Sequence, residues 1–153
     1  MNARDLVNTY GDMLYRICLM SLRNHADAED AVQEVFLKYL TRAPDFDTPE
    51  HEKAWLITVA LNPCRNMLRS QRIIPTDPEQ LHPPENPPEQ NQILDALMQV
   101  PEKFREVLIL HYIEGYKLKE IAGIIGKSTS AVKMRLSKGK KLLEQIYRKE
   151  YLS

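Results

Sequence analysis

Apolar residues recur every three or four positions along most of the chain, which is the spacing of one face of an α-helix. The first such stretch spans about Ala3 to Leu22. A second follows Asp27, which we expect to cap it, and a third starts at Pro49 behind a capping Thr48. No long stretch alternates apolar and polar residues in the way of a β-strand, so the pattern predicts an all-α protein.

The three stretches carry apolar faces that we expect to pack into one core. Those faces comprise Leu6, Tyr10, Met13, Leu14 and Ile17 in the first, Ala31, Val32, Val35, Phe36, Tyr39 and Leu40 in the second, and Trp55, Leu56 and Val59 in the third. Trp55 could stack on a nucleic-acid base, but its apolar neighbours favour the core. Pro63 falls inside the third stretch, where it costs a free helix about 3 kcal/mol, so we expect a kink or a break near Asn62.

Proline is dense in the middle of the chain, at positions 75, 78, 83, 84, 87 and 88. This density forbids a continuous helix and favours an extended, semi-rigid tether. We therefore expect two small helical domains, residues 1–72 and 93–153, joined by a Pro-rich acidic linker at residues 73–92.

The second domain is predicted to contain a helix that supports a helix-turn-helix. The supporting helix runs from about Glu102 to Glu114, ends near Gly115 and turns its apolar face toward the core through Phe104, Val107, Leu108 and Tyr112. In the helix-turn-helix, Gly126 supplies the left-handed residue that ends the first helix and Ser128 can cap the second. The first helix carries its apolar spacing on Leu118, Ile121, Ala122 and Ile125.

The second helix of this motif has an apolar face and a basic face. We expect the apolar face, Val132, Leu136, Leu143 and Ile146, to pack inward. The stretch from Lys127 to Lys141 holds six basic residues and no acid, which indicates a polyanionic partner such as DNA. Thr129 and Ser130 open the helix, where a helix docked in a DNA groove places its base-reading side chains. An ordinary helical hairpin with a solvated basic face would give the same pattern.

Arg135 has two interpretations on this helix. It can reach a phosphate, or it can pair with Glu120 on the preceding helix and only brace the motif.

Charge is unevenly distributed, although the chain holds 21 basic and 21 acidic residues. The net charge is −2 over residues 1–69, −3 over residues 70–92 and +5 over residues 93–153. The C-terminal part is therefore the one expected to attract a polyanion, and DNA would repel the linker.

Cys18 and Cys64 lie on separate expected helices without a paired spacing, so we expect buried thiols. The sequence shows no nucleophile beside a base, no paired carboxylates and no metal-ligand spacing that would indicate an enzyme. We therefore expect no enzyme, no metal and no cofactor. The start of the chain lacks the order of a signal peptide and no apolar run is long enough to span a bilayer, so a cytoplasmic protein is expected, without membrane insertion.

The chain resembles the extracytoplasmic-function (ECF) group of the sigma-70 family, the promoter-recognition subunits of bacterial RNA polymerase. Region 2.2 of the family resembles DAEDAVQEVFLKYL, regions 2.3 and 2.4 resemble AWLITVALNPCRNMLR, and region 4 resembles KEIAGIIGKSTSAVKMRLSKGKKLL. Two motif sets in the right order are far more specific than one helix-turn-helix. The chain departs from the family at Pro63, where similar sequences carry an uninterrupted helix.

The resemblance implies a role for three groups of residues. Docking on the coiled-coil clamp of the polymerase beta-prime subunit is implied for Asp30, Gln33 and Glu34. Contact with the minus-ten element is implied for Asn62, Arg65 and Arg69, and for Phe46 in the loop from Pro44 to Thr48 that captures a flipped base. Contact with the minus-thirty-five element is implied for Thr129, Ser130, Lys133 and Lys138, with Arg135 as a further candidate.

The partners implied are core RNA polymerase, through the beta-prime clamp and the beta flap, promoter DNA and an anti-sigma factor. Two alternatives stay open at this point. The chain could be a free-standing helix-turn-helix regulator that binds duplex DNA without polymerase, or a sigma-like interaction protein without promoter activity.

Overall fold

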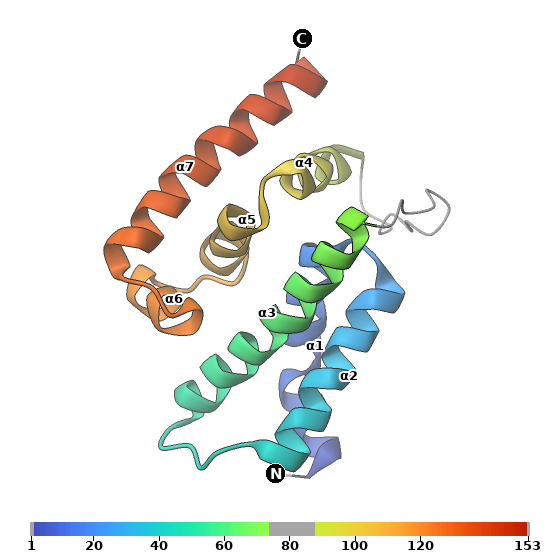
Figure 1. Ribbon diagram of the computed structural model, residues 1–153, viewed down its shortest axis with the longest axis vertical. Helices are drawn as coiled ribbons and strands as arrows, with labels where there is room; N and C mark the ends of the chain where they lie inside the picture. The colour runs from blue at the N-terminus through green and yellow to red at the C-terminus, as the bar shows by residue number, and fades with distance from the viewer. Residues whose placement is uncertain (1, 74–87, 153) are drawn as a thin grey trace. The chain divides into compact units, whose positions relative to one another are not determined.

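The computed structural model describes residues 2–73 and 88–152, and these are helical apart from short connections (Figure 1). The all-α prediction is confirmed for this part of the chain. The elements are α1 (Ala3–Leu22), α2 (His25–Arg42), α3 (Pro49–Ile73), α4 (Pro88–Gln99), α5 (Glu102–Leu108), the π-helical turn η2 (Ile109–Ile113), α6 (Leu118–Ile125), α7 (Thr129–Tyr147) and the π-helical turn η3 (Arg148–Leu152).

The described helices separate into two compact units, α1 to α3 and α4 to η3. Residues 74–87 of the expected linker lie outside the described residues. Residues 88–92 differ from the expectation, because they already form the start of α4. Pro88 is the first residue of that helix, a position where the missing N–H has no helical partner in any case.

The first unit packs three helices around one apolar core. Its centre consists of Leu6, Leu14, Cys18 and Leu22 from α1, Ala28, Ala31 and Val35 from α2, and Leu56, Ala60 and Cys64 from α3. Trp55 packs at the edge of this core, in agreement with the sequence interpretation. Cys18 and Cys64 are both buried thiols, also as expected.

The turn between α1 and α2 corrects one prediction. Asn24, and not Asp27, caps α2, since the Asn24 Oδ1 accepts a hydrogen bond from the backbone N–H of Asp27 at 2.9 Å. Arg23 makes the tight turn possible by adopting a left-handed φ of 51°. Asp27 lies in the first turn of α2, where its negative charge suits the helix dipole.

Helix α3 begins as predicted but is not interrupted. Thr48 caps it through a 3.1 Å hydrogen bond from the N–H of His51 to Oγ1. The helix then runs through Pro63 to Ile73, so of the kink or break expected near Asn62 the break is wrong. Pro63 is itself buried, as are Leu61 and Cys64, and burial of apolar side chains along this part of α3 offsets the one backbone hydrogen bond that proline cannot make.

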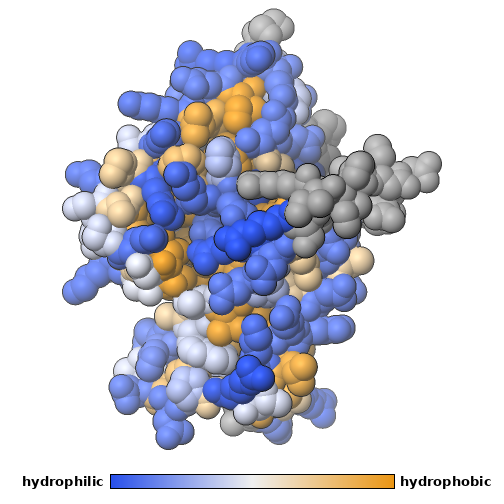
Figure 2. All heavy atoms as spheres, viewed as in Figure 1, coloured by the Kyte–Doolittle hydropathy of each residue, from blue (hydrophilic) through white to orange (hydrophobic). Residues whose placement is uncertain are grey.

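One leucine of α2 was expected in the core and is not there. Leu40 is 51% exposed, and Leu37, one turn earlier, is 63% exposed. The buried stripe of α2 instead continues from Val35 to the half-buried Phe36 and Tyr39. The outer face of α2 therefore carries apolar side chains. Figure 2 shows orange, hydrophobic patches between the blue, hydrophilic ones on the face in view.

In the second unit, the helix expected from Glu102 to Glu114 changes its winding at Ile109. The N–H of Glu114 bonds to the carbonyl oxygen of Ile109 at 3.0 Å, which closes a π-turn. Phe104, Val107 and Leu108 are buried as predicted, but Tyr112 is 58% exposed. Its inward placement is wrong because the wider turn shifts every later side chain around the helix axis.

A buried arginine joins α4 to α5. Arg105 is 5% exposed, and its Nη1 donates to the carbonyl oxygens of Met98 at 2.9 Å and Val100 at 3.0 Å. These are the carbonyls at the end of α4, which have no helical partner of their own. A charged side chain therefore fixes the corner between the two helices.

Helix α7 crosses α5 at a glycine. A Cβ atom added at Gly139 would lie 3.1 Å from the Cβ of Phe104 and 3.3 Å from the side chain of Leu108. Gly139 is buried on α7, in line with Val132 and Leu136. The absence of a side chain at this position lets the two helices approach closely.

We expect Gly139→Leu to lower the free energy of unfolding by about 1–3 kcal/mol, because the added side chain must displace Phe104 and Leu108. Gly123→Leu is the matched control, since a Cβ at exposed Gly123 in α6 meets nothing within 4 Å and leucine favours helix over glycine. Urea unfolding followed by circular dichroism measures both. Equal effects of the two substitutions would contradict the close crossing.

Candidate functional site

The second unit contains the predicted helix-turn-helix. Helix α6 ends at Gly126, whose φ of +69° is the left-handed conformation that favours glycine. Ser128 caps α7 through a 3.1 Å hydrogen bond from the N–H of Ala131 to its Oγ. The side chains of Ile121, Ala122, Ile124, Val132 and Leu136 are buried between the elements, so the predicted helix, three-residue turn and helix are confirmed.

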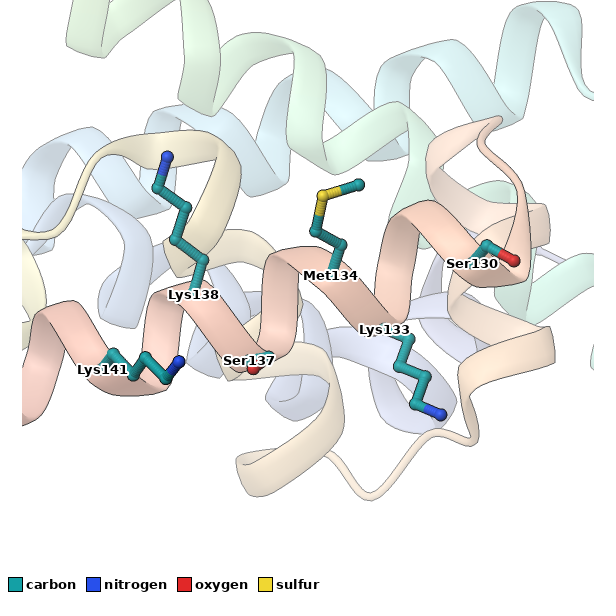
Figure 3. A pocket seen from close by; sticks show the side chains of 6 residues that line it. All are labelled: Ser130, Lys133, Met134, Ser137, Lys138 and Lys141. Atoms are coloured by element: carbon teal, nitrogen blue, oxygen red, sulfur yellow. The ribbon is translucent and has the colours of Figure 1, made fainter.

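The face of α7 opposite this core is exposed and basic. Thr129, Ser130, Lys133 and Lys138 are all exposed, as are Lys127, Lys140 and Lys141. Figure 3 shows lysine side chains extending from α7 to several sides, with Ser130 near the start of the helix. They surround a shallow hollow of about 500 Å³ that is lined by Ser130, Lys133, Met134, Ser137, Lys138 and Lys141.

Lys138 and Arg135, two of the candidate DNA-binding cations on α7, differ from the others in their contacts or burial. The Nζ of Lys138 lies 5.3 Å from the ring centroid of Phe104, at the distance of a cation–π contact. Arg135 is half-buried. Glu120, its alternative partner, accepts a 2.9 Å hydrogen bond from the N–H of Lys117 and so caps the start of α6.

In the first unit, an aromatic cluster holds the loop that connects α2 to α3. The ring of Phe46 stacks on Tyr39 with centroids 6.1 Å apart. It also makes edge contacts with Trp55 at 5.7 Å and with His51 at 5.4 Å. Phe46, the residue of this loop expected to contact DNA, is therefore half-buried and packed against both flanking helices.

Glu52 connects this cluster to α1. Its two carboxylate oxygens accept hydrogen bonds from the hydroxyls of Tyr10, at 2.6 Å, and Tyr39, at 2.7 Å. The hydrogen bond to Glu52, followed by burial, raises the pKa of Tyr39 to about 12. Burial, followed by the bond to Glu52, raises the pKa of Tyr10 further. Both phenols are therefore neutral donors at any physiological pH, and one carboxylate links all three helices.

The remaining candidates of the first unit lie on two helix faces. Asn62 and Arg69 are exposed on α3, and Arg65 between them is half-buried; their spacing of three and four residues puts them on one face. Asp30, Gln33 and Glu34 are exposed on α2, and Glu34 pairs with Lys38 at 3.7 Å.

Both candidate surfaces also contain an exposed apolar residue that the sequence pattern did not predict there. Leu37 follows Asp30, Gln33 and Glu34 along the same face of α2, and Met134, on α7, is 67% exposed among lysines and serines. The sequence contains a signal for both residues, because each is apolar but lies outside the apolar stripe that its helix buries.

The second unit also has an apolar groove of about 280 Å³. Three of its side chains are large exposed hydrophobics, namely Ile93, Tyr112 and Ile113. Contact with a protein would remove this surface from water. The groove is lined by Ile93, Leu94, Leu97, Leu108, Tyr112, Ile113, Lys140 and Leu143.

The described ranges contain neither a metal-binding cluster nor a membrane-spanning helix. No group of three or more His, Cys, Asp and Glu side chains among these residues is placed to hold a metal ion. No helix in the same ranges is both long and apolar enough to cross a bilayer.

Comparison with known proteins matches both units. The family profile for Sigma-70 region 2 matches residues 6–73, and the profile for Sigma-70 region 4 matches residues 90–143. The RNA polymerase sigma factor SigV of Bacillus subtilis is 32% identical over 144 residues, which cover 91% of this chain and 87% of SigV. The RNA polymerase sigma factor CarQ of Myxococcus xanthus is 30% identical over 134 residues, covering 82% and 77% of the two chains.

The fold also matches a solved structure. The sigma factor RpoE of Bartonella quintana, in complex with the anti-sigma factor NepR, superimposes with a TM-score of 0.78 at 21% identity. The match covers 96% of this chain and 97% of that one.

Replacement of Glu52 tests the anchoring of the loop. We expect Glu52→Gln to lower the pKa of Tyr39 from about 12 toward its ordinary value, because the charged acceptor is lost. The raised pKa stabilises the fold fully below pH about 10, and this contribution disappears as the pH rises through the folded-state value. Tyrosinate ultraviolet absorbance in an alkaline titration measures the shift.

The emission of Trp55, the single tryptophan, reports on the aromatic cluster in the same samples. Exposed Glu50→Gln on the same turn of α3 is the control and should leave the Tyr39 titration nearly unchanged. Identical titration curves for Glu52→Gln and the unaltered protein would show that Glu52 does not anchor Tyr39.

Proposed function

The chain belongs to the ECF group of the sigma-70 family, and from this premise we propose how its surfaces serve an RNA polymerase sigma factor. A sigma factor directs core polymerase to specific promoters and assists DNA melting at initiation. The observation that best supports this proposal is the basic face of α7, which an intact helix-turn-helix leaves exposed to solvent. Polymerase would supply the catalysis, and this chain would supply position and strand opening.

Core polymerase would dock on the outer face of α2. Asp30, Gln33 and Glu34 are exposed there and match the positions by which the family binds the beta-prime clamp. Leu37 extends this face by an apolar side chain that is 63% exposed. Acidic residues beside an apolar anchor suit a basic protein surface, since the charges steer the encounter and burial of the leucine adds affinity.

The minus-ten element would contact the loop before α3 and the outer face of α3. Asn62, Arg65 and Arg69 share that face, and both arginines carry the charge that a DNA strand attracts. Unstacking a base costs a few kcal/mol, which its capture in a protein pocket can offset. A loop that is already held by Phe46 in the aromatic cluster loses less conformational entropy when it captures that base.

The minus-thirty-five element would contact α7. Lys133, Lys138 and Arg135 would bind phosphates and set the register of the helix on DNA. Thr129 and Ser130, exposed at the start of α7, would contact base edges in the major groove. The phosphate contacts supply affinity and the base contacts supply sequence preference.

Two further expectations follow from the partner. We place the protein in the cytoplasm, because core polymerase works there. We also propose an anti-sigma factor that covers these surfaces until it is removed, an idea supported by the fold that the chain shares with RpoE, which was solved with such a factor.

The alternatives predict different binding behaviour. A free-standing regulator would bind duplex DNA without polymerase. An interaction protein would bind no promoter, even in the presence of polymerase. Runoff transcription with purified core polymerase on genomic fragments distinguishes the three, since only a sigma factor starts transcripts at defined sites. That experiment also yields the promoter needed for the tests below.

For polymerase binding, we expect Asp30→Lys and Glu34→Lys each to weaken affinity for core polymerase by about tenfold or more, because each puts a like charge against a basic surface. Asp12→Lys, an exposed reversal on α1, is the matched control and should bind normally. Titration of labelled variants with core polymerase measures the affinities. Normal binding by both α2 variants would remove α2 as the docking surface.

For DNA binding, we expect Lys133→Ala and Lys138→Ala to weaken promoter binding by the holoenzyme and to lower the salt dependence by about one ion each. Lys103→Ala is the control for Lys138→Ala. The Nζ of Lys103 also lies over the Phe104 ring, 5.0 Å from its centroid, but Lys103 belongs to α5 and not to the face of α7. Fluorescence anisotropy over a salt series gives the slopes. Unchanged affinity at low salt for both α7 variants would mean that another face binds DNA.

A further inference from the structure

Met134 is an anomaly on the basic face of α7. At 67% exposure it is more exposed than the other large exposed hydrophobics of the described chain, such as Leu37 at 63% and Tyr112 at 58%. Its neighbours around the hollow are Lys133, Ser137, Lys138 and other polar side chains. A single exposed apolar side chain is ordinary on a protein surface. Met134, however, lies in the hollow of the basic face, where its side chain would meet any DNA that binds there.

Helix geometry excludes a role for Met134 in the core of the second unit. Val132 and Leu136 are buried, and each lies two residues from Met134. Two residues correspond to about 200° around an α-helix, so Met134 faces away from the contact with α5 and α6. Figure 3 shows its side chain extending on the same side of α7 as Lys138, one turn later.

The chemistry of the thioether restricts what Met134 can contact on DNA. Methionine has no hydrogen-bond donor and only a weak acceptor. Placed over the polar edges of guanine, adenine or cytosine, it would leave their donors and acceptors without partners, which is costly. The C5-methyl group of thymine is the apolar feature of the major groove, and a flexible methionine side chain can pack against it.

We propose that Met134 contacts the C5-methyl group of a thymine in the upstream promoter element and selects thymine at that base pair. This inference rests on the proposed function, because it requires α7 to lie in the major groove. Ser130, on the preceding turn, and Lys138, on the following turn, would supply the polar contacts on either side. Met134 is then a specificity-determining residue that adds little to non-specific affinity.

The test uses holoenzyme and a promoter duplex that it transcribes. Each thymine of the protected upstream segment is replaced singly by deoxyuridine, which lacks only the methyl group. We expect one replacement to weaken binding by the unaltered holoenzyme about fourfold, the effect of one buried methyl group. Met134→Ala should bind the thymine and deoxyuridine versions of that position equally.

Two variants control for size and polarity at the same position. Met134→Leu keeps an apolar side chain and should retain most of the dependence on the methyl group, whereas Met134→Gln should lose it. Because Met134 is exposed, none of these changes should shift the thermal unfolding midpoint measurably.

The outcomes separate this inference from the proposed function. If Lys133→Ala weakens binding to every duplex while Met134→Ala keeps the same deoxyuridine profile as the unaltered protein, α7 binds DNA but Met134 does not read thymine. If Met134→Ala instead weakens binding to core polymerase alone, the side chain serves a protein contact and the inference is overturned. If holoenzyme binds no promoter duplex, the proposed function fails, and the inference with it.

Discussion

The close packing of α7 on α5 at Gly139 determines which side chains the second unit presents to solvent. Val132, Leu136 and Gly139 lie along one line of α7, and a Cβ added at Gly139 would lie 3.1 Å from the Cβ of Phe104, so a side chain there would force the two helices or Phe104 to shift. Once this line faces inward, helix geometry leaves the lysines and Met134 outside. The same crossing brings Lys138 over the Phe104 ring. A packing contact in the core thus sets the chemistry of the surface that we assign to DNA.

The first unit achieves a comparable result with a carboxylate. Glu52 bonds to tyrosines of α1 and α2 from its place on α3, and the ring of Tyr39 continues this connection to Phe46 in the loop. Both units therefore hold a candidate DNA-contacting segment on a rigid support. The segment is the loop before α3 in the first unit and helix α7 in the second. Rigid supports favour binding because less conformational freedom is lost on contact.

Hydrophobic spacing and capping residues predicted much of the fold, including α1, the start of α3 and the helix-turn-helix around Gly126 and Ser128. The misses have physical causes that lie outside a single helix. Burial of Pro63 overrides the local cost of proline, and the π-turn at Ile109 changes the register that a regular helix would keep. The bond from Tyr10 to Glu52 spans 42 residues, which no local pattern reveals. For the candidate site, exposure of the α7 lysines agrees with the sequence, whereas every contact with DNA or polymerase stays a prediction.

The wider winding at η2 adds two side chains to the apolar groove of the second unit. In an α-helix continued from Phe104 and Leu108, Tyr112 would lie on the inner side. The extra residue in the π-turn rotates the aromatic ring outward, beside Ile113 and Ile93. One wider turn therefore adds an aromatic and an aliphatic side chain to a groove that α4, α5 and α7 already line with leucine and isoleucine. A change in helical winding thus enlarges an apolar surface without any change in composition.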